Sequence, residues 1–206
     1  MLSTYSRSEI EDRPLLLRTM HEDRKRVFVD TLKWDLKHDG SQEHDDFDRI
    51  DATYLVSSDI EGKHLCSVRL LDTESTHLLG TVFPQLCESG VPRASDVKEI
   101  TRYIASPRLR ASERQRARNM VCRALIEYGL LHGIRMYTAI CEMSFLTQML
   151  AAGWRCDPLG LPQRIDGSII GAFCIHVEPE AIDKMVQGWR WPTPALEGFF
   201  PQQTAA

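Results

Sequence analysis

A cluster of carboxylates beside aromatic side chains marks the segment that runs from Trp34 to Val56. Acidic residues recur through it, among them Asp39, Glu43, Asp45, Asp46, Asp48 and Asp51. Trp34 begins the segment and Phe47 lies inside it. Because aromatic faces attract cations and carboxylates pair with ammonium groups, this combination predicts a site for a cation. That cation is either a metal ion or an organic molecule.

A metal ion is the less favoured occupant. A calcium loop between two helices requires oxygen ligands at fixed positions, a central glycine and a closing glutamate. In DGSQEHDDFDRID the glycine comes too early and no glutamate closes the loop. His44 lies among the acids, but no HExxH motif or second histidine at helical spacing supports a transition metal. We therefore predict no metal here, and a solvated acidic loop remains the alternative to a site for an organic cation.

Charged residues also interrupt two segments that have the composition of buried strands. Arg69 lies in CSVRLL, and Glu99 and Arg102 lie in VKEITRYI. Side chains alternate along a strand, so Glu99 and Thr101 share one face, and Arg102 points to the other unless a bulge intervenes. Buried charges are costly unless they are paired. Two interpretations follow: a structural ion-pair network that includes Arg24 and the acidic loop, or a polar pocket for a zwitterion, which we favour.

Helices and strands alternate around these residues. Apolar spacing of three and four predicts helices at 14–34, 111–133, 143–152 and 180–189. Runs rich in β-branched residues predict strands at 52–57, 64–71, 97–105, 135–141 and 168–177. The clearest helix is expected to begin with a capping box of Ser112 and Gln115 and to end at Gly133. The pattern predicts an α/β fold, with one mixed central sheet flanked by helices.

Length and composition fit one domain that spans residues 1–206, with 192–206 as a loosely ordered tail. The chain has 206 residues, of which 43% are hydrophobic and 26% charged. A net charge of −4 disfavours binding to nucleic acid. No apolar run reaches the roughly 18 residues of a membrane span, and the N-terminus is unlike a signal peptide. The six cysteines form no CxxC pair and predict free thiols in a reducing cytoplasm.

Four motifs occur together and in order. An Arg-x-x-x-Phe motif with a following tryptophan is present as Arg24, Phe28 and Trp34. An Asp-x-x-Asp motif with a following ATY is present as Asp45 and Asp48, a strand arginine as Arg69, and a Glu-x-Thr-Arg motif as Glu99, Thr101 and Arg102. In this order and spacing the chain resembles the acyl-homoserine-lactone synthases, the autoinducer synthases of bacterial quorum sensing.

The resemblance implies an acyltransferase fold of the GNAT type and a defined reaction. An acyl chain on acyl carrier protein, or on coenzyme A instead, is transferred to the α-amine of S-adenosylmethionine. Lactonisation then releases 5′-methylthioadenosine, and no further cofactor is implied. Carboxylates and aromatic faces would complement the ammonium and sulfonium of this substrate, and an arginine would take its carboxylate. A general N-acyltransferase that uses acyl-CoA and another amine, or a non-catalytic S-adenosylmethionine-binding module, remains an alternative.

The resemblance also assigns roles to individual residues. Glu99 is the candidate base for the α-amine, Asp45 helps to hold the ammonium, and Arg102 is a candidate donor to the oxyanion. The remaining residues expected to bind S-adenosylmethionine are Arg24, Phe28, Trp34, Asp48, Arg69 and Thr101, with Phe28 and Trp34 forming a lid.

The acyl side is expected in the segment MYTAICEMSFLTQML. Along it, an acyl tunnel is expected to be lined by Cys141, Met143, Leu146 and Met149. Several synthases that prefer 3-oxo chains carry a threonine on this strand, where Cys141 is the nearest match, which argues against that preference.

Arginines dominate the segment that precedes and begins the 111–133 helix. Arg108, Arg110, Arg114, Arg116 and Arg118 replace the glycine-rich loop by which GNAT enzymes bind coenzyme A. Acyl carrier proteins are acidic, so the charge of this cluster suits them as a docking site. A solvated basic helix start is the alternative.

Overall fold

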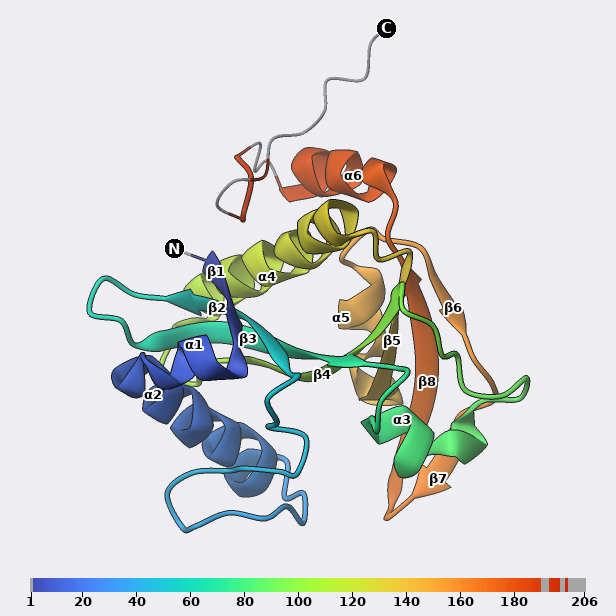
Figure 1. Ribbon diagram of the computed structural model, residues 1–206, viewed down its shortest axis with the longest axis horizontal. Helices are drawn as coiled ribbons and strands as arrows, with labels where there is room; N and C mark the ends of the chain where they lie inside the picture. Colours follow the sequence, from blue (N-terminus) through green and yellow to red (C-terminus); the bar gives the residue numbers. More distant parts are fainter. Residues whose placement is uncertain (1, 190–192, 197–198, 200–206) are drawn as a thin grey trace, which may run out of the picture.

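The computed structural model describes residues 2–189, 193–196 and 199, which form one sheet with helices on both faces (Figure 1). The strands are β1 (Leu2–Ser6), β2 (Thr53–Ser58), β3 (His64–Asp72), β4 (Val97–Ala105), β5 (Met136–Glu142), β6 (Cys156–Pro158), β7 (Gln163–Ile165) and β8 (Ser168–His176). The helices are α1 (Arg7–Glu11), α2 (Pro14–Arg24), α3 (Leu78–Thr81), α4 (Ala111–His132), α5 (Leu146–Leu150) and α6 (Pro179–Trp189). Short turns of other helix types are η1 (Lys25–Thr31), η2 (Pro84–Leu86) and η3 (Met143–Phe145).

The strand order is β1-β2-β3-β4-β5-β8-β6, and β7 also pairs with β8. The pair β4–β5 is parallel, whereas the other pairs are antiparallel, so the predicted mixed sheet is confirmed. The five predicted strands and four predicted helices are present. The expected tail at 192–206 lies largely outside the described residues.

Several short elements were not predicted. Strand β1 has the sequence LSTYS, in which only Leu2 is buried, and the three-residue β6 contains a proline. Such segments carry too few apolar residues for a period-two pattern to emerge. Their backbone pairing with β2 and β8 forms them instead.

Helix α4 begins two residues earlier than its predicted cap. Arg110 is the N-cap residue, and its backbone N–H donates to the Glu113 carboxylate at 2.9 Å. The predicted capping box of Ser112 and Gln115 is therefore wrong, and the Gln115 amide instead bonds to Asn119 one turn on. The predicted end at Gly133 is confirmed, because this residue adopts the left-handed conformation with a φ of 66°.

Helices cover the two faces of the sheet unequally. Helices α4, α5 and α6 lie over one face and enclose the larger apolar core, which includes Val68, Val121 and Phe173 (Figure 1). On the other face, α1 and α2 cover β1–β3, and α3 lies near β4 and β5. A smaller core of Met20, Tyr54 and neighbouring residues fills the space beneath α2. Polar residues that enter this second face are therefore held between α2 and the sheet.

Strand β4 is the pivot of the sheet. It pairs with β3 along its length, but with β5 only from Val97 to Ile100. Beyond Ile100 the register with β3 shifts, so that two residues of β4, Arg102 and Tyr103, lie opposite Val68. Arg102 has a φ of 50°, which an L-residue adopts only at a local cost of about 1–3 kcal/mol. This bulge separates the two halves of the sheet and redirects the side chain of Arg102.

Among residues 2–189, 193–196 and 199, the helices lack the combination of length and apolar character that would cross a bilayer.

Candidate functional site

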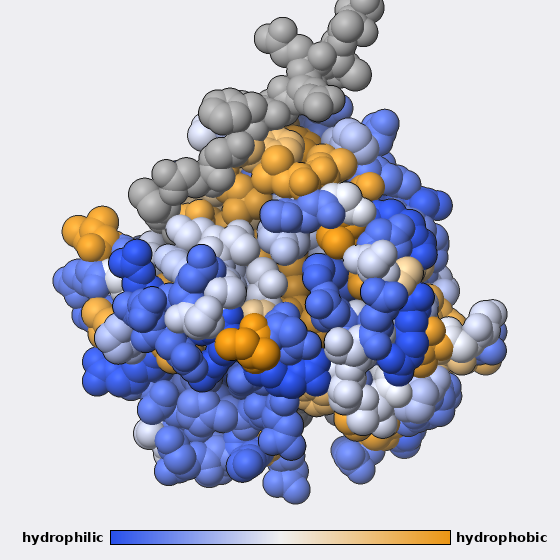
Figure 2. Space-filling view, in the orientation of Figure 1, coloured by the Kyte–Doolittle hydropathy of each residue, from blue (hydrophilic) through white to orange (hydrophobic). Residues whose placement is uncertain are grey.

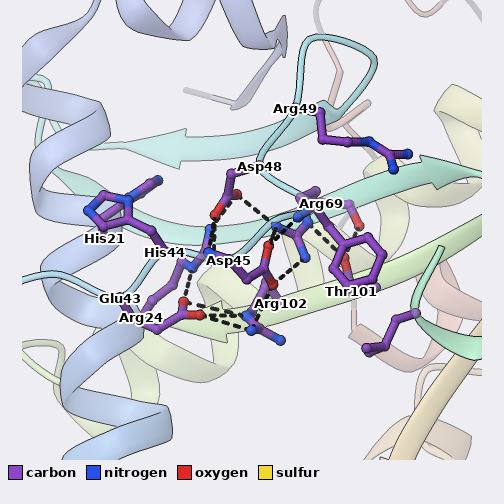
Figure 3. Close-up of polar contacts among 12 residues, drawn as sticks. His21, Arg24, Glu43, His44, Asp45, Asp48, Arg49, Arg69, Thr101 and Arg102 are labelled. Carbon is purple, nitrogen blue, oxygen red and sulfur yellow. Dashed lines mark hydrogen bonds and ion pairs between the residues drawn. The ribbon is translucent and has the colours of Figure 1, made fainter. Parts of the chain in front are cut away.

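Three arginines and three carboxylates meet between α2 and the sheet (Figure 3). We refer to this group as the arginine–carboxylate cluster; its members are Arg24, Glu43, Asp45, Asp48, Arg69 and Arg102. Five of these residues were predicted site residues, and they come from α2, the following loop, β3 and β4. The structure therefore brings together positions up to 78 residues apart in sequence.

Arg24, at the end of α2, contacts two of the acids. Its two terminal nitrogens donate to the two oxygens of Asp48 at 2.8 and 2.9 Å, and its Nε donates to Glu43 at 2.5 Å. A bidentate arginine–carboxylate pair fixes both side chains in one geometry. Arg24 thus anchors the acidic loop to the helix.

Arg69 and Arg102 complete the cluster from the sheet. Arg69 pairs with both oxygens of Asp45 at 2.5 and 2.9 Å, reaches Asp48 at 2.8 Å, and donates through Nε to Thr101 at 3.0 Å. Arg102 donates to Glu43 at 2.8 Å and lies 2.7 Å from Asp45. The β4 bulge explains how Thr101 and Arg102, neighbours in sequence, both reach this face.

The charges of the cluster balance, and arginine contacts determine its electrostatics. Burial alone would raise the pKa of Asp48, but Arg24 and Arg69 hold it well below its usual range. Burial alone would raise the pKa of Asp45 as well, but its contacts with Arg69 and Arg102 together lower it. The Tyr54 hydroxyl donates to Asp48 at 2.8 Å, and burial raises its pKa. The structure thus contains the ion-pair network that was one of our two interpretations.

Solvent reaches the cluster mainly at Asp45. Its side chain is 17% exposed, compared with 5% for Asp48 and 0% for Glu43. Arg102 is 8% exposed and lies beside it. A zwitterionic ligand would meet a carboxylate and a guanidinium here, at the same edge. The interpretations of a structural network and of a polar pocket are thus compatible.

Phe28 and Trp34 stack above this edge. Their ring centroids are 5.0 Å apart with planes inclined by 13°, and the Arg102 guanidinium lies 5.4 Å from the Phe28 centroid. Residues Lys25–Thr31 form a π-helical turn, and Lys33 has a φ of 61°, so the chain turns back before Trp34. The Trp34 indole N–H donates to Glu142 of β5 at 3.0 Å. Phe28 and Trp34 thus form one stacked unit that joins the α2 side to β5, and their role as a lid stays a prediction.

Glu99, the predicted base, does not join the cluster through a hydrogen bond that the structure describes. It lies on the same face of β4 as Thr101 and is fully buried. Its two oxygens accept from the backbone N–H groups of Leu78 and Leu79 at 2.7 and 2.6 Å. Burial raises its pKa to about 7 in spite of these two bonds. Glu99 is thus a carboxyl group that can gain or lose a proton near neutral pH.

His21, which is buried, and His44, which is partly buried, lie next to the cluster with their Nδ1 atoms 2.5 Å apart (Figure 3). Burial lowers the pKa of His21 to about 3. Asp48 has an oxygen near both rings, which makes these three residues a candidate metal group. The Asp48 oxygens already accept from Arg24, Arg69, Tyr54 and a backbone N–H. Because its lone pairs are used, this group does not suit a metal ion.

The predicted acyl-tunnel residues lie on the opposite face of the sheet. Met149 is buried, and Cys141, Met143 and Leu146 are partly buried against the larger core. Tyr103, the second residue of the bulge, packs with Phe145 at a centroid distance of 6.1 Å in the same region. Tyr103 and Cys141 lie beyond Ile100 and Ala139, the last paired residues of β4 and β5, and the other tunnel residues follow β5. That these residues line an acyl tunnel stays a prediction.

The predicted docking arginines differ in their surroundings. Arg110 and Arg116 are exposed at the start of α4, whereas Arg114 and Arg118 are half-buried and donate to the Leu109 carbonyl and to Gln148. Arg108 reaches Asp23, the His64 carbonyl and Ser106. Arg108, Arg114 and Arg118 therefore have structural contacts in addition to any surface role.

Sequence reasoning left Glu43, Tyr54 and Glu142 out of the site. Glu43 lies among the acids of the loop, and only its full burial between Arg24 and Arg102 distinguishes it. Tyr54 directly faces Arg69 across the β2–β3 pair, which the sequence would reveal only with the strand register known. Glu142 ends a strand and meets Trp34 from 108 residues away, a contact without a local signal.

Comparison with known proteins agrees with this geometry. The family model described as autoinducer synthase matches residues 8–185 of the chain. The chain belongs to the autoinducer synthase family. An acyl-homoserine-lactone synthase of Acinetobacter nosocomialis is 29% identical over 161 residues, which cover 75% of this chain and 88% of that protein. Because the chain belongs to the autoinducer synthase family, this protein is an acyltransferase that makes acyl-homoserine lactones.

Solved structures confirm the fold. The CoA-dependent acyl-homoserine lactone synthase BjaI, in a structure with SAM and isopentyl-CoA, is 24% identical and superposes with a TM-score of 0.86 over 96% of this chain and 92% of its own. A putative N-acetyltransferase from Lactobacillus plantarum is 14% identical, with a TM-score of 0.52 over 86% and 99% of the two chains. The GNAT-like acyltransferase architecture predicted from sequence is thereby confirmed.

Proposed function

We propose that this autoinducer synthase transfers an acyl chain from an acyl thioester to the α-amine of S-adenosylmethionine, and that lactonisation then releases 5′-methylthioadenosine. The observation that carries the proposal is the pairing of Asp45 with Arg102 at the exposed edge of the cluster, beneath the Phe28–Trp34 stack. An amino acid with a sulfonium group presents a carboxylate, an ammonium and a second cation. A guanidinium, a carboxylate and aromatic faces complement these three groups.

The acyl-transfer step requires a neutral amine. Glu99, with a pKa of about 7, can accept a proton at neutral pH, which Asp45 and Asp48 with their lowered pKa values cannot do effectively. Since Glu99 is buried and both its oxygens accept backbone N–H bonds, we propose that the proton reaches it through a water molecule. Arg102 and backbone N–H groups of β4 beyond Ile100 would donate to the tetrahedral oxyanion.

Lactonisation needs no further protein nucleophile and no cofactor. The carboxylate of the acylated substrate attacks its own γ-carbon, and the thioether leaves with its electron pair. The contribution of the protein to this step is to hold the methionyl chain folded and to exclude water. The stack of Phe28 and Trp34, tied to Glu142, is placed to do both.

We infer an acyl-carrier-protein donor from the exposed Arg110 and Arg116, since such carriers are acidic. The similarity to BjaI, a CoA-dependent synthase whose structure contains isopentyl-CoA, makes coenzyme A the alternative donor for this chain. Both thioesters deliver the acyl group through a pantetheine arm, which would enter where β4 and β5 diverge. Cys141, Met143, Leu146 and Met149 would then line the acyl site. We place the reaction in the cytoplasm, where both donors and S-adenosylmethionine occur.

One incubation tests this proposal. The protein is mixed with S-adenosylmethionine and matched sets of acyl-carrier-protein and acyl-CoA thioesters, and the products are identified by mass spectrometry. We expect 5′-methylthioadenosine and an acyl-homoserine lactone in equal amounts. Acylation of another amine, without 5′-methylthioadenosine, would identify a general N-acyltransferase instead. Binding of S-adenosylmethionine without any product from either donor set would contradict the catalytic proposal.

A further inference from the structure

Three side chains with metal-binding atoms converge at the β6–β8 pair, away from the arginine–carboxylate cluster. Cys174 and His176 are two residues apart on β8 and share one face of the sheet. Asp157 of β6 lies directly opposite Cys174 in the antiparallel register. The ligand atoms of all three lie within 4.8 Å of one another. In Figure 1, β6 and β8 form the side of the sheet opposite α2.

The contacts converge on a single histidine nitrogen. His176 Nε2 lies 2.7 Å from an Asp157 oxygen and 3.6 Å from Cys174 Sγ. A nucleophilic cysteine with a histidine base and an orienting acid would use both ring nitrogens, one for each partner. Here the thiol and the carboxylate face the same nitrogen. This arrangement is unsuited to a catalytic triad. Instead the Cys174 thiol, the Asp157 carboxylate and one His176 nitrogen lie close together, as ligands of a metal ion do.

The distances match a tetrahedral ion. With Zn–S and Zn–N bonds of about 2.3 and 2.05 Å, two ligands at the tetrahedral angle have their atoms about 3.6 Å apart. That value equals the separation of Cys174 Sγ and His176 Nε2 in the structure. Asp157 is 52% exposed, so its side chain is free to move by the fraction of an ångström that opens its hydrogen bond to His176.

We propose that Asp157, Cys174 and His176 bind a divalent transition-metal ion such as Zn²⁺, with water as the fourth ligand. Cys174 is nearly buried beside Val97 and Met136, and His176 is 21% exposed, so the ion would have an apolar floor and an opening to solvent. Burial also raises the pKa of the Cys174 thiol, so that an arriving metal ion would displace its proton.

Two charged neighbours modulate the site. Arg155 lies 3.9 Å from the Asp157 carboxylate, but its Nε pairs with Glu178 at 3.0 Å. A guanidinium so close to a ligand repels a dication. Removing that charge in Arg155→Gln should therefore tighten metal binding, which is the opposite of what loss of a structural contact would do.

Titration of the tag-free, reduced protein with Co²⁺ tests the proposal, because cobalt bound to a thiolate shows a near-ultraviolet charge-transfer band. We expect one saturable site whose band Zn²⁺ removes by competition. Cys174→Ser should abolish the band. His176→Asn and Asp157→Asn should each weaken binding by more than the roughly 10–100-fold that loss of a hydrogen-bond partner of a ligand costs.

Cys156→Ser is the matched control, because Cys156 precedes Asp157 on β6 and its side chain lies on the other face of the strand. It should retain the band, and circular dichroism should show all variants folded. A band that survives Cys174→Ser, or that disappears equally in Cys156→Ser, would overturn the assignment. Failure of the wild-type protein to bind Co²⁺ saturably would overturn it as well. Histidine-only binding near His21 and His44 would give no thiolate band.

Discussion

Two buried carboxylates on the same face of the sheet, Asp48 and Glu99, have opposite electrostatic surroundings. Asp48 accepts from two guanidinium groups and from Tyr54, and its pKa lies far below the usual value. Glu99 has only backbone N–H donors, and burial raises its pKa to about 7. Burial therefore does not by itself determine the protonation state of an acid. The presence of a paired cation does.

In the proposed mechanism, this difference in pKa assigns substrate binding to Asp48 and proton transfer to Glu99. A permanently ionised acid holds cations and fixes arginines, but it is a weak base at neutral pH. An acid that titrates near pH 7 can remove a proton from an ammonium group. The arginine–carboxylate cluster, which is ionised, therefore lies under α2, whereas Glu99, whose pKa is about 7, lies under α3. Figure 2 shows hydrophilic residues over α2 and the acidic loop, and hydrophobic residues gathered near α6, on the other face of the sheet.

Neutralising Asp48, which is paired with two arginines, should have the largest effect, and that effect should be on stability. Asp48→Asn keeps the shape of the side chain but leaves Arg24 and Arg69 without a buried counter-charge. Removing one partner of a buried ion pair costs about 3–5 kcal/mol, and we expect that loss in the free energy of unfolding measured with urea. Asp46→Asn, at an exposed neighbouring position, is the control and should change stability by no more than about 0.5 kcal/mol. Equal stability of the two variants would show that the cluster is not coupled to folding.

Neutralising Glu99, which has no paired cation, should slow the reaction and leave the affinity for S-adenosylmethionine nearly unchanged. Glu99→Gln should lower kcat by about 100-fold or more, while the Kd for S-adenosylmethionine, measured by calorimetry, changes by less than about threefold. Because a base acts only when deprotonated, the wild-type rate should rise with pH through about 7 and level off above it. A variant with near-native turnover would show that the amine loses its proton by another route.

Glu142 is a third acid to set beside Asp48 and Glu99. It is half-buried and accepts a hydrogen bond from the neutral indole of Trp34. Trp34→Phe retains an aromatic ring over Phe28 but removes the indole N–H that donates to Glu142. One such bond is worth about 1 kcal/mol, so the affinity for S-adenosylmethionine should fall by about fivefold. Glu142→Gln keeps an acceptor and should have a smaller effect. A larger loss in Glu142→Gln would mean that the charge of Glu142 acts directly on the substrate.

Exposed charges should matter least. Arg110→Ala removes an exposed charge at the start of α4 and should raise the KM for an acyl carrier protein by no more than about fivefold, since such contacts are worth about 0.2–1 kcal/mol. The effect should shrink as salt increases. Arg18→Ala, an exposed position on α2, is the control. If both variants change KM equally, the effect is one of net charge and docking occurs elsewhere.

The sequence predicted the members of the site better than their roles. Arg24 and Arg69 were identifiable because charged residues in apolar patterns must find partners, and Asp48 because it lies in an acidic segment beside aromatic residues. The bulge that turns Arg102 toward Glu43 depends on the register of β3 and β4, which alternation along one strand does not contain. The capping error at α4 has a similar origin, since Ser112 and Glu113 both suit a helix start and the tertiary position of Arg110 decides between them.

Glu99 illustrates the limit most clearly. Its position in a strand indicated a charged residue with a function, but its pKa depends on the absence of a nearby guanidinium bond and on two N–H groups of α3. The sequence analysis predicted no helix or strand in the segment that contains α3. Without the position of that segment, the sequence could not show whether Glu99 is buried with a raised pKa or forms a further ion pair with Arg69.

The most direct test is a carboxyl ¹³C NMR titration of the folded protein that resolves Glu99 and Asp48. Glu99→Gln and Asp48→Asn, where folded, would assign the two signals. We predict that Glu99 titrates with a midpoint near pH 7, and that Asp48 stays ionised through the whole range from pH 8 down to about 4. A Glu99 midpoint below about 5, the usual range for a glutamate, would contradict the division between an ionised binding acid and a titrating base.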